Sequence, residues 1–197
     1  MTLKQKERLE LKIKRIRATL AAEKRKFGGY DDSRGMRYVP TTLYLKLQDY
    51  KGGLVYTRWF KKNFPTDVGF PGFLFEWTVI LFMNCRIKEA EHKAVETFFS
   101  NTYVFDKFFG RPINPIDKAE YSNICIPEYT NYFPYTFNQP ELKEFTAFLS
   151  AFEQSIKFKT VAEKFINSRI QLKIEQNMEE RRKLVRIPEK LLEEFQG

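Results

Sequence analysis

The chain has 197 residues, with 34 Lys and Arg against 25 Asp and Glu, which gives a formal net charge of +9 at pH 7. Its 20 Phe, 10 Tyr and 2 Trp supply enough apolar side-chain area for a packed core in a single domain. The two cysteines, Cys85 and Cys125, lack the spacing of a zinc site or a disulfide framework, so the composition excludes a small disulfide-stapled protein.

Apolar stretches are short throughout the chain. Residues 73–83 are strongly apolar, but Glu76 interrupts them and they are too few to span a membrane. The N-terminus lacks the apolar segment of a secretory signal. We therefore expect a cytoplasmic protein with reduced cysteines.

Residues 3–27 are predicted to form a basic amphipathic helix. The apolar residues Leu9, Ile13, Ile16, Leu20 and Phe27 recur at helical spacing, and Gly28-Gly29 ends the pattern. The first 29 residues hold ten bases and three acids, a net +7, whereas the rest of the chain carries only +2. One side of this helix should pack on the domain while the other presents basic side chains.

Three interpretations of the basic side remain open. It can be a solvated helix face without a ligand, an arm that binds nucleic acid, or a surface that lies on an anionic membrane. As an arm it would neutralise phosphates with Lys12, Lys14, Arg15, Arg17, Lys24 and Arg25. The solvated face is the simplest of the three.

Residues 34–102 follow a pattern of two helix pairs. Pro65 ends the first pair, and Pro71 suits the first turn of the second. The predicted helices are 39–47 with 50–63, and 71–83 with 87–99. Residues 49–54 match residues 86–91, an offset of 37 positions. The sequence therefore predicts an internal repeat of a helical hairpin.

This layout resembles the tetratricopeptide repeat, a helix–turn–helix unit of about 34 residues. Tyr50, Gly53 and Pro65 stand where that family has an aromatic residue, a small residue and a proline. In the second unit Ala90 takes the small position, while Thr102 replaces the proline. The resemblance implies an all-α fold of antiparallel helix pairs, and an irregular helical bundle with hairpins of similar length is the alternative.

The resemblance also implies a concave partner-binding face, lined by the first helix of each pair. The residues placed on it are Tyr38, Thr42 and Lys46 in the first unit, and Phe75, Val79 and Phe82 in the second. Phe75 and Phe82 are large for a surface that faces solvent, so burial in the core is the competing interpretation.

The remaining residues are predicted to form a connection and further helices. Residues 103–140 are rich in Tyr and Pro and should cover the helical core as an aromatic connection. Within 141–197 we expect a helix near 141–156 and, after a capping box of Thr160 and Glu163, a long helix over 161–186. The side chains expected inside that long helix are Val161, Phe165, Ile170, Ile174 and Met178, and Pro188 should open a short terminal helix.

Residues for catalysis or metal binding are scarce. His92 is the sole histidine, and the glycines lack the pattern of a phosphate-binding loop. Asp31 and Asp32, beside Arg34 and Arg37, are best interpreted as a salt-bridged turn. We therefore expect a non-catalytic protein without a cofactor or metal. Its leading predicted function is protein–protein interaction, with a peptide or partner protein bound through the helix pairs, and nucleic-acid binding by the basic helix is the alternative.

Overall fold

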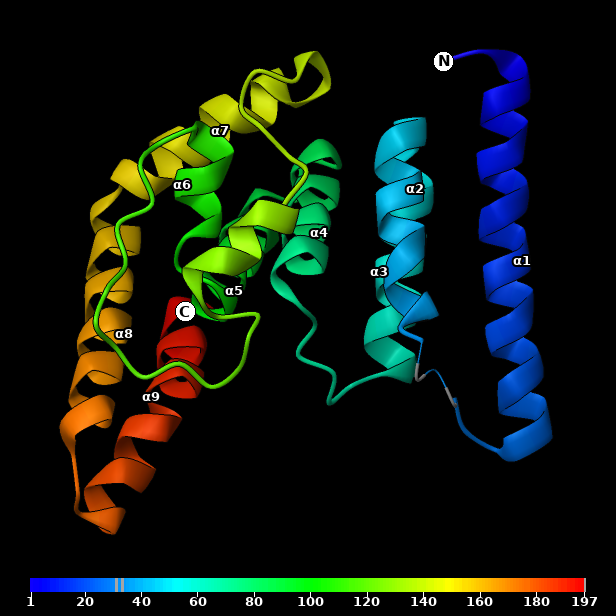
Figure 1. Cartoon of the computed structure of the whole chain (residues 1–197). Coiled ribbons are helices and arrows are strands. Elements are labelled where there is room, and N and C mark those ends of the chain that lie inside the picture. Colours follow the sequence, from blue (N-terminus) through cyan, green and yellow to red (C-terminus); the bar gives the residue numbers. More distant parts are fainter. Residues whose placement is uncertain (31, 33, 197) are drawn as a thin grey trace.

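The computed structural model describes residues 1–30, 32 and 34–196, and every regular element within them is a helix. The α-helices are α1 (Leu3–Phe27), α2 (Val39–Leu47), α3 (Tyr50–Asn63), α4 (Pro71–Met83), α5 (Ile87–Ser100), α6 (Val104–Phe109), α7 (Lys143–Gln154), α8 (Ile156–Ile174) and α9 (Met178–Gln196). Short 3-10 helices cover Met36–Tyr38, Pro127–Tyr132 and Pro140–Leu142. The predicted all-α fold is confirmed, and Figure 1 shows the helices in a row from α1 at one edge to α8 and α9 at the other.

The caps of α1 and its apolar stripe explain where this helix begins, ends and packs. Thr2 and Gln5 form a reciprocal capping box at its start, and Gly28, in the left-handed region at φ 73°, ends it. Its buried side chains are Ile13, Ile16 and Leu20, which join a core cluster with α2 and α3. Phe27 was expected in the same stripe but is 62% exposed, and its ring contacts the ammonium of Lys26.

Two stacked helix pairs follow, with the predicted boundaries. α2 pairs with α3, α4 pairs with α5, and α3 packs on α4 (Figure 1). The turn inside each pair contains one non-glycine residue in the left-handed region, Gln48 at φ 54° and Cys85 at φ 56°. These two residues are 37 positions apart, the same offset as in the sequence. The turns of the two pairs therefore share this feature, which is compatible with a helical repeat.

Small residues allow the stacked helices to approach closely. A Cβ atom at Gly53 of α3 would lie only 2.9 Å from Cδ1 of Ile80 of α4. Ala90 of α5 is fully buried in a cluster with Phe60 and Trp77. The contact at Gly53 therefore joins neighbouring helix pairs.

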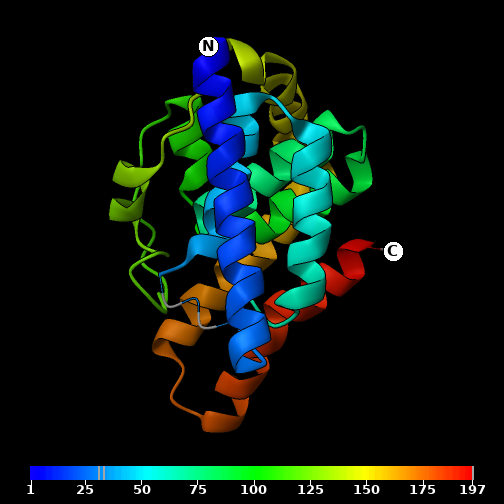
Figure 2. The same cartoon turned by 90° about the vertical axis from the view of Figure 1, so that its right-hand side faces the viewer.

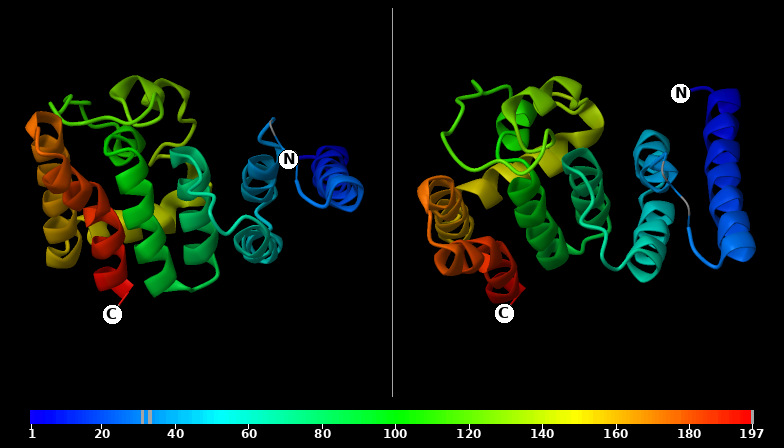
Figure 3. Two further views of the ribbon diagram at one scale, coloured as in Figure 1. Left: turned by 90° about the horizontal axis from the view of Figure 1, so that it is seen from below. Right: turned by 60° about the horizontal axis from the view of Figure 1, so that its bottom comes forward.

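The aromatic connection between α6 and α7 covers one side of the row. Figures 2 and 3 show this segment on one side, with α3 and the end of α9 on the opposite side. Its side chains complete the core, because the rings of Phe133 and Tyr135 lie 4.9 and 5.3 Å from that of Phe75 of α4. The connection is thus part of the folded domain.

The start of α8 differs from the prediction. Ser155 accepts a hydrogen bond from the backbone N–H of Phe158 at 3.1 Å and caps the helix. α8 therefore begins ahead of Thr160 and Glu163, which lie inside it. The hydroxyl groups of Ser155 and Thr160 could each cap a helix, and the structure uses Ser155.

The predicted helix over 161–186 is wrong, because the chain forms two helices there. The guanidinium of Arg181 in α9 donates to the carbonyls of Leu172 and Glu175, and so satisfies the end of α8. Asn177 accepts the backbone N–H groups of the first turn of α9. A helical hairpin replaces the long helix.

Burial along this hairpin also differs from the prediction. Phe165 is buried as expected and Val161 is partly buried. The side chains expected inside but found exposed are Ile170, Ile174 and Met178, which lie toward the tip of the hairpin. Pro188 does not open a new helix, since α9 continues through it.

Replacing Gly53 with Leu should lower the free energy of unfolding by roughly 1–3 kcal/mol, because the side chain of Ile80 must move to make room. Urea denaturation followed by circular dichroism measures the change. Val55→Leu, at an exposed position of the same helix, is the control and should stay within about 0.5 kcal/mol of the parent protein. An unchanged midpoint for Gly53→Leu would show that the spacing of α3 and α4 does not depend on this glycine.

Candidate partner-binding grooves

The second-unit residues predicted for the concave face do not form an open surface. Phe75 and Val79 are fully buried, so they belong to the core. Phe82 is partly buried and stacks on Phe148 of α7, with ring centroids 4.7 Å apart. The partner-binding interpretation fails at Phe75 and Val79, because the chain covers that side of α4 itself.

Two of the three first-unit residues make hydrogen bonds within the chain. The hydroxyl of Tyr38 donates to the carboxylate of Asp67 at 2.7 Å, and Thr42 donates to Glu76, also at 2.7 Å. Only Lys46 is exposed. The six residues therefore do not come together as one binding site.

Glu76 is the polar centre of this closed side. Thr41 and Tyr135 each donate to its carboxylate at 2.5 Å, in addition to Thr42. The carboxylate is buried, and this burial, opposed by the three hydrogen bonds, raises its pKa to about 7. These bonds join α2, α4 and the aromatic connection, so Glu76 serves the fold.

The other side of the row carries a groove between α3 and α5, which we call the α3–α5 groove. Its volume is about 680 Å³. Phe195 of α9 also lines this groove. Apolar side chains of α3 and α4 form its floor, among them Phe60, Leu74, Trp77 and Leu81. An apolar floor of this size can receive side chains of a partner.

Lys93 lies in the α3–α5 groove with most of its side chain covered. Its ammonium is 4.2 Å from the centre of the Trp77 ring and 2.5 Å from the carboxylate of Glu96. Burial lowers the pKa of Lys93 in spite of this carboxylate. Burial alone would raise the pKa of Glu96, but hydrogen bonds from His92 and Lys93 lower it overall. Lys93 and Glu96 form an ion pair within α5, and the contact of the Lys93 ammonium with the Trp77 ring joins α5 to α4.

The rim of the α3–α5 groove is cationic. Its exposed bases are Arg58 and Lys61 of α3, Lys88 of α5 and Lys157 of α8. None of these four makes an ion pair within residues 1–30, 32 and 34–196. Three of the four acids that line the groove are paired, Asp67 with Arg37, Glu89 with Arg86, and Glu96 with Lys93. An excess of positive charge therefore surrounds the apolar floor.

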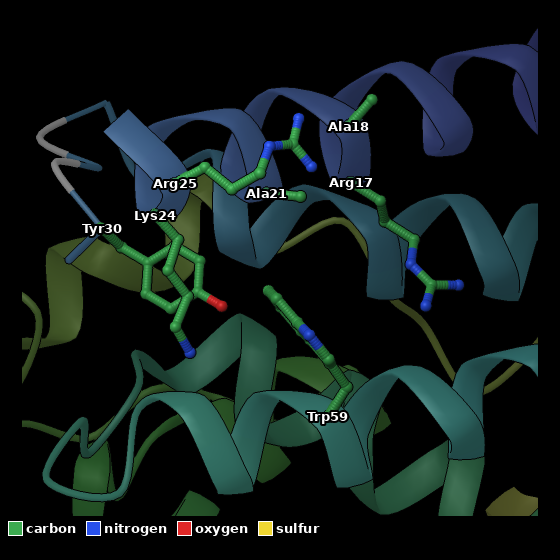
Figure 4. Close-up of a pocket in the computed structure, with 7 residues that line it drawn as sticks. All are labelled: Arg17, Ala18, Ala21, Lys24, Arg25, Tyr30 and Trp59. Atoms are coloured by element: carbon green, nitrogen blue, oxygen red, sulfur yellow. The ribbon is translucent and has the colours of Figure 1, made fainter. Parts of the chain in front are cut away.

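A second groove lies between α1 and α3, and we call it the α1–α3 groove. It has a volume of about 610 Å³, and Figure 4 shows Trp59 rising from α3 between the side chains of α1 and Tyr30. The ammonium of Lys24 and the hydroxyl of Tyr30 both donate to Asn63, at 2.9 and 2.8 Å. These bonds tie the end of α1 to the end of α3 and fix that part of the groove.

The six bases predicted for nucleic-acid binding divide between two sides of α1, and all are exposed. Arg17, Lys24 and Arg25 line the α1–α3 groove. Lys14 lies on the same side of the helix by its spacing from Ala18, Ala21 and Arg25. The other two, Lys12 and Arg15, lie on the opposite flank. Lys4 and Arg8 lie on that flank too, because successive members of this set of four bases are three or four positions apart.

The predicted salt-bridged turn is confirmed at Asp32. Its carboxylate accepts the backbone N–H groups of Met36 and Arg37 and pairs with the Arg37 guanidinium at 3.1 Å. Asp31 lies outside the described residues.

Sequence analysis missed Trp59, Trp77 and Lys93 as residues of the two grooves. The one local signal that could have indicated a groove was in α3, which contains four bases and no acid.

Comparison of the chain with protein-family models, with curated proteins and with solved structures finds no match. The likeness to a helical repeat is carried by the residue pattern and by the repeated backbone of the two pairs. No helix in the described ranges combines the length and the apolar character needed to cross a bilayer.

The buried carboxyl of Glu76 makes stability depend on pH. Its pKa of about 7 lies above the value of 4.5 expected in the unfolded chain, so its contribution is complete below about pH 4.5 and is lost as the pH rises through about 7. The loss should be about 3 kcal/mol. Urea denaturation between about pH 5 and pH 8 should show stability falling with pH in the parent protein but not in Glu76→Gln.

Glu144→Gln is the control for this experiment, because Glu144 is exposed on α7. It should keep the pH dependence of the parent protein. An identical slope in Glu76→Gln and in the parent protein would show that another group causes the dependence.

Proposed function

We propose that this chain is a non-catalytic protein-interaction module of the tetratricopeptide-like kind, which acts in the cytoplasm. Its ligand is an acidic amphipathic segment of a partner protein, bound in the α3–α5 groove. The observation that carries the proposal is the apolar floor of Trp77, Phe60 and Leu81 inside a rim of bases that make no ion pair with the described part of the chain. Both cysteines are free thiols, in keeping with a reducing compartment.

The shape of the groove suits a helical or extended segment. α3 and α5 are each 14 residues long and form two walls over the shared floor of α4. An amphipathic segment recognised in this way places apolar side chains on the floor and charged ones at the rim. Arg58 and Lys61 stand on one wall and Lys88 on the other, so acids on both flanks of the segment would find a base.

The closed concave side supports the choice of this groove. A tetratricopeptide-like array is expected to use the side lined by the first helices, but there the aromatic connection and α7 cover Phe75 and Phe82. The second helices, α3 and α5, leave their groove open. Glu76 and Lys93, whose pKa values are shifted by burial, are both engaged with neighbouring side chains, which favours a binding role over catalysis.

A synthetic helical peptide with Leu on one face and Glu on both flanks should bind the protein, as measured by fluorescence anisotropy. Lys61→Glu combined with Lys88→Glu should weaken this binding about tenfold or more, because it reverses one charge on each wall. The same peptide with Lys in place of Glu should bind far more weakly.

The control is Lys12→Glu combined with Arg15→Glu, which makes the same change in net charge on a flank of α1 away from the groove. It should keep the affinity of the parent protein. Equal weakening by both double variants would mean that the peptide senses overall charge alone, and the groove would then not be the site.

A further inference from the structure

The net positive charge of the molecule is concentrated on the two helices that flank the α1–α3 groove. Residues 1–29 carry +7, and α3 adds Lys51, Arg58, Lys61 and Lys62 without an acid, which makes +11. The whole chain carries +9, so everything outside these two segments has a net charge of −2. The four bases of α3 are all exposed. Folding therefore places two basic segments side by side that are separate in the sequence.

Aromatic rings lie inside this basic surface. Trp59 lines the α1–α3 groove and packs on Tyr56 beneath it, with ring centroids 5.3 Å apart. Tyr30 meets Trp59 edge-on at 5.8 Å, and the ammonium of Lys24 lies 5.1 Å from the centre of the Tyr30 ring. Figure 4 shows the guanidinium groups of Arg17 and Arg25 on the α1 side of the groove. Rings and cations thus line one groove.

We propose that the α1–α3 groove binds single-stranded nucleic acid. A base stacks against Trp59, while Arg17, Lys24 and Arg25 contact the phosphates on either side of it. Stacking on aromatic rings together with a positively charged groove is the general mode by which proteins hold single strands. A paired base is not free to enter beside Trp59, so the duplex is the poorer ligand.

The flank of α1 that faces away from the groove carries further bases. Lys4, Arg8, Lys12 and Arg15 recur every three or four residues, a rise of about 6 Å for four residues. None of them makes an ion pair in the part of the chain that the structure describes. These bases add to the positive field of α1, which attracts a polyanion toward this end of the molecule.

A membrane fits this surface less well. The apolar stripe of α1 is used against the domain, since Ile13, Ile16 and Leu20 are buried. A helix that lies on a membrane needs its apolar face free to enter the lipid.

An acidic protein segment also fits this surface less well than a single strand. The α1–α3 groove offers the α1 methyl groups of Ala18 and Ala21 and the rings of Trp59 and Tyr30. It exposes less apolar surface in total than the α3–α5 groove does. Planar groups joined to regularly spaced negative charges match these features better than aliphatic side chains do.

The first test uses fluorescein-labelled oligo(dT) of about 12 nucleotides, a length within the range that single-strand-binding grooves accept. Fluorescence anisotropy should show binding whose log affinity falls linearly with log salt, with a slope of about −2 for three phosphate contacts. A hairpin duplex of similar length, a poly-glutamate peptide and phosphatidylserine vesicles should each bind at least about tenfold more weakly.

Two double variants then locate the site. Arg17→Glu with Arg25→Glu should weaken oligo(dT) binding about tenfold or more. Arg186→Glu with Lys190→Glu, at exposed positions of α9, makes the same change in net charge and should have little effect. Circular dichroism confirms that both variants are folded.

Tryptophan fluorescence reports the stacked base directly. The chain has two tryptophans, and Trp77→Phe leaves Trp59 as the single reporter. Its emission should be quenched when oligo(dT) binds. The proposal is overturned by absence of oligo(dT) binding, by preference for the poly-glutamate peptide or the vesicles, by equal weakening in both double variants, or by binding that leaves Trp59 emission unchanged. Because an acidic peptide can also bind in the α3–α5 groove, poly-glutamate binding is measured in Lys61→Glu combined with Lys88→Glu, so that no outcome depends on that groove.

Discussion

The carboxylate of Glu76 and its three hydroxyl donors are the interaction on which the arrangement of the domain depends. Thr41 and Thr42 belong to α2, Glu76 to α4 and Tyr135 to the connection before α7. A buried carboxyl without hydrogen bonds would cost several kcal/mol, so these donors and this acid must come together in the folded state. The aromatic connection is thereby held against the helix pairs, and its rings of Phe133 and Tyr135 complete the core around Phe75.

The position of the open surfaces follows from this constraint. The side of the pairs lined by α2 and α4 is filled from within the chain, whereas two grooves beside α3 are open to another molecule. α3 is a wall of both. Its Trp59 faces the α1–α3 groove, while Phe60 and Lys61 belong to the α3–α5 groove. Consecutive residues of one helix thus serve two surfaces with different chemistry, one aromatic and basic, the other apolar with a basic rim.

Local signals predicted most of the helix boundaries, because strong helix breakers lie at them. Gly28 ends α1, Pro65 follows α3, and Pro71 begins α4. The region of α8 and α9 was predicted less well, because Ser155 and Thr160 offer competing caps and only the packed structure decides between them. The hydrogen bonds of Arg181 to the end of α8 cannot be seen in a pattern of apolar spacing.

The site was harder to predict than the fold. α4 is apolar on all sides, and its residues from Pro71 to Leu81 are all buried, so periodicity could not show which side of it faces a groove. Phe75 and Val79 were placed on a partner surface because the tetratricopeptide resemblance implies one along the first helix of each pair, but they lie in the core. Trp59 and Arg17 are 42 positions apart in the sequence, and their meeting depends on how α1 packs beside α3.

The basic helix α1 also has a consequence for self-association. In arrays of stacked helix pairs an exposed end unit can stack on the end of another copy, and a polar terminal helix opposes this. α1 forms one end of the row, with its apolar stripe turned inward (Figure 1), and it carries ten bases. Two copies meeting through their α1 ends would bring like charges together in low-salt solution, where screening is weakest. End-to-end growth through α1 is therefore opposed electrostatically, and a polyanion bound there would remove that repulsion.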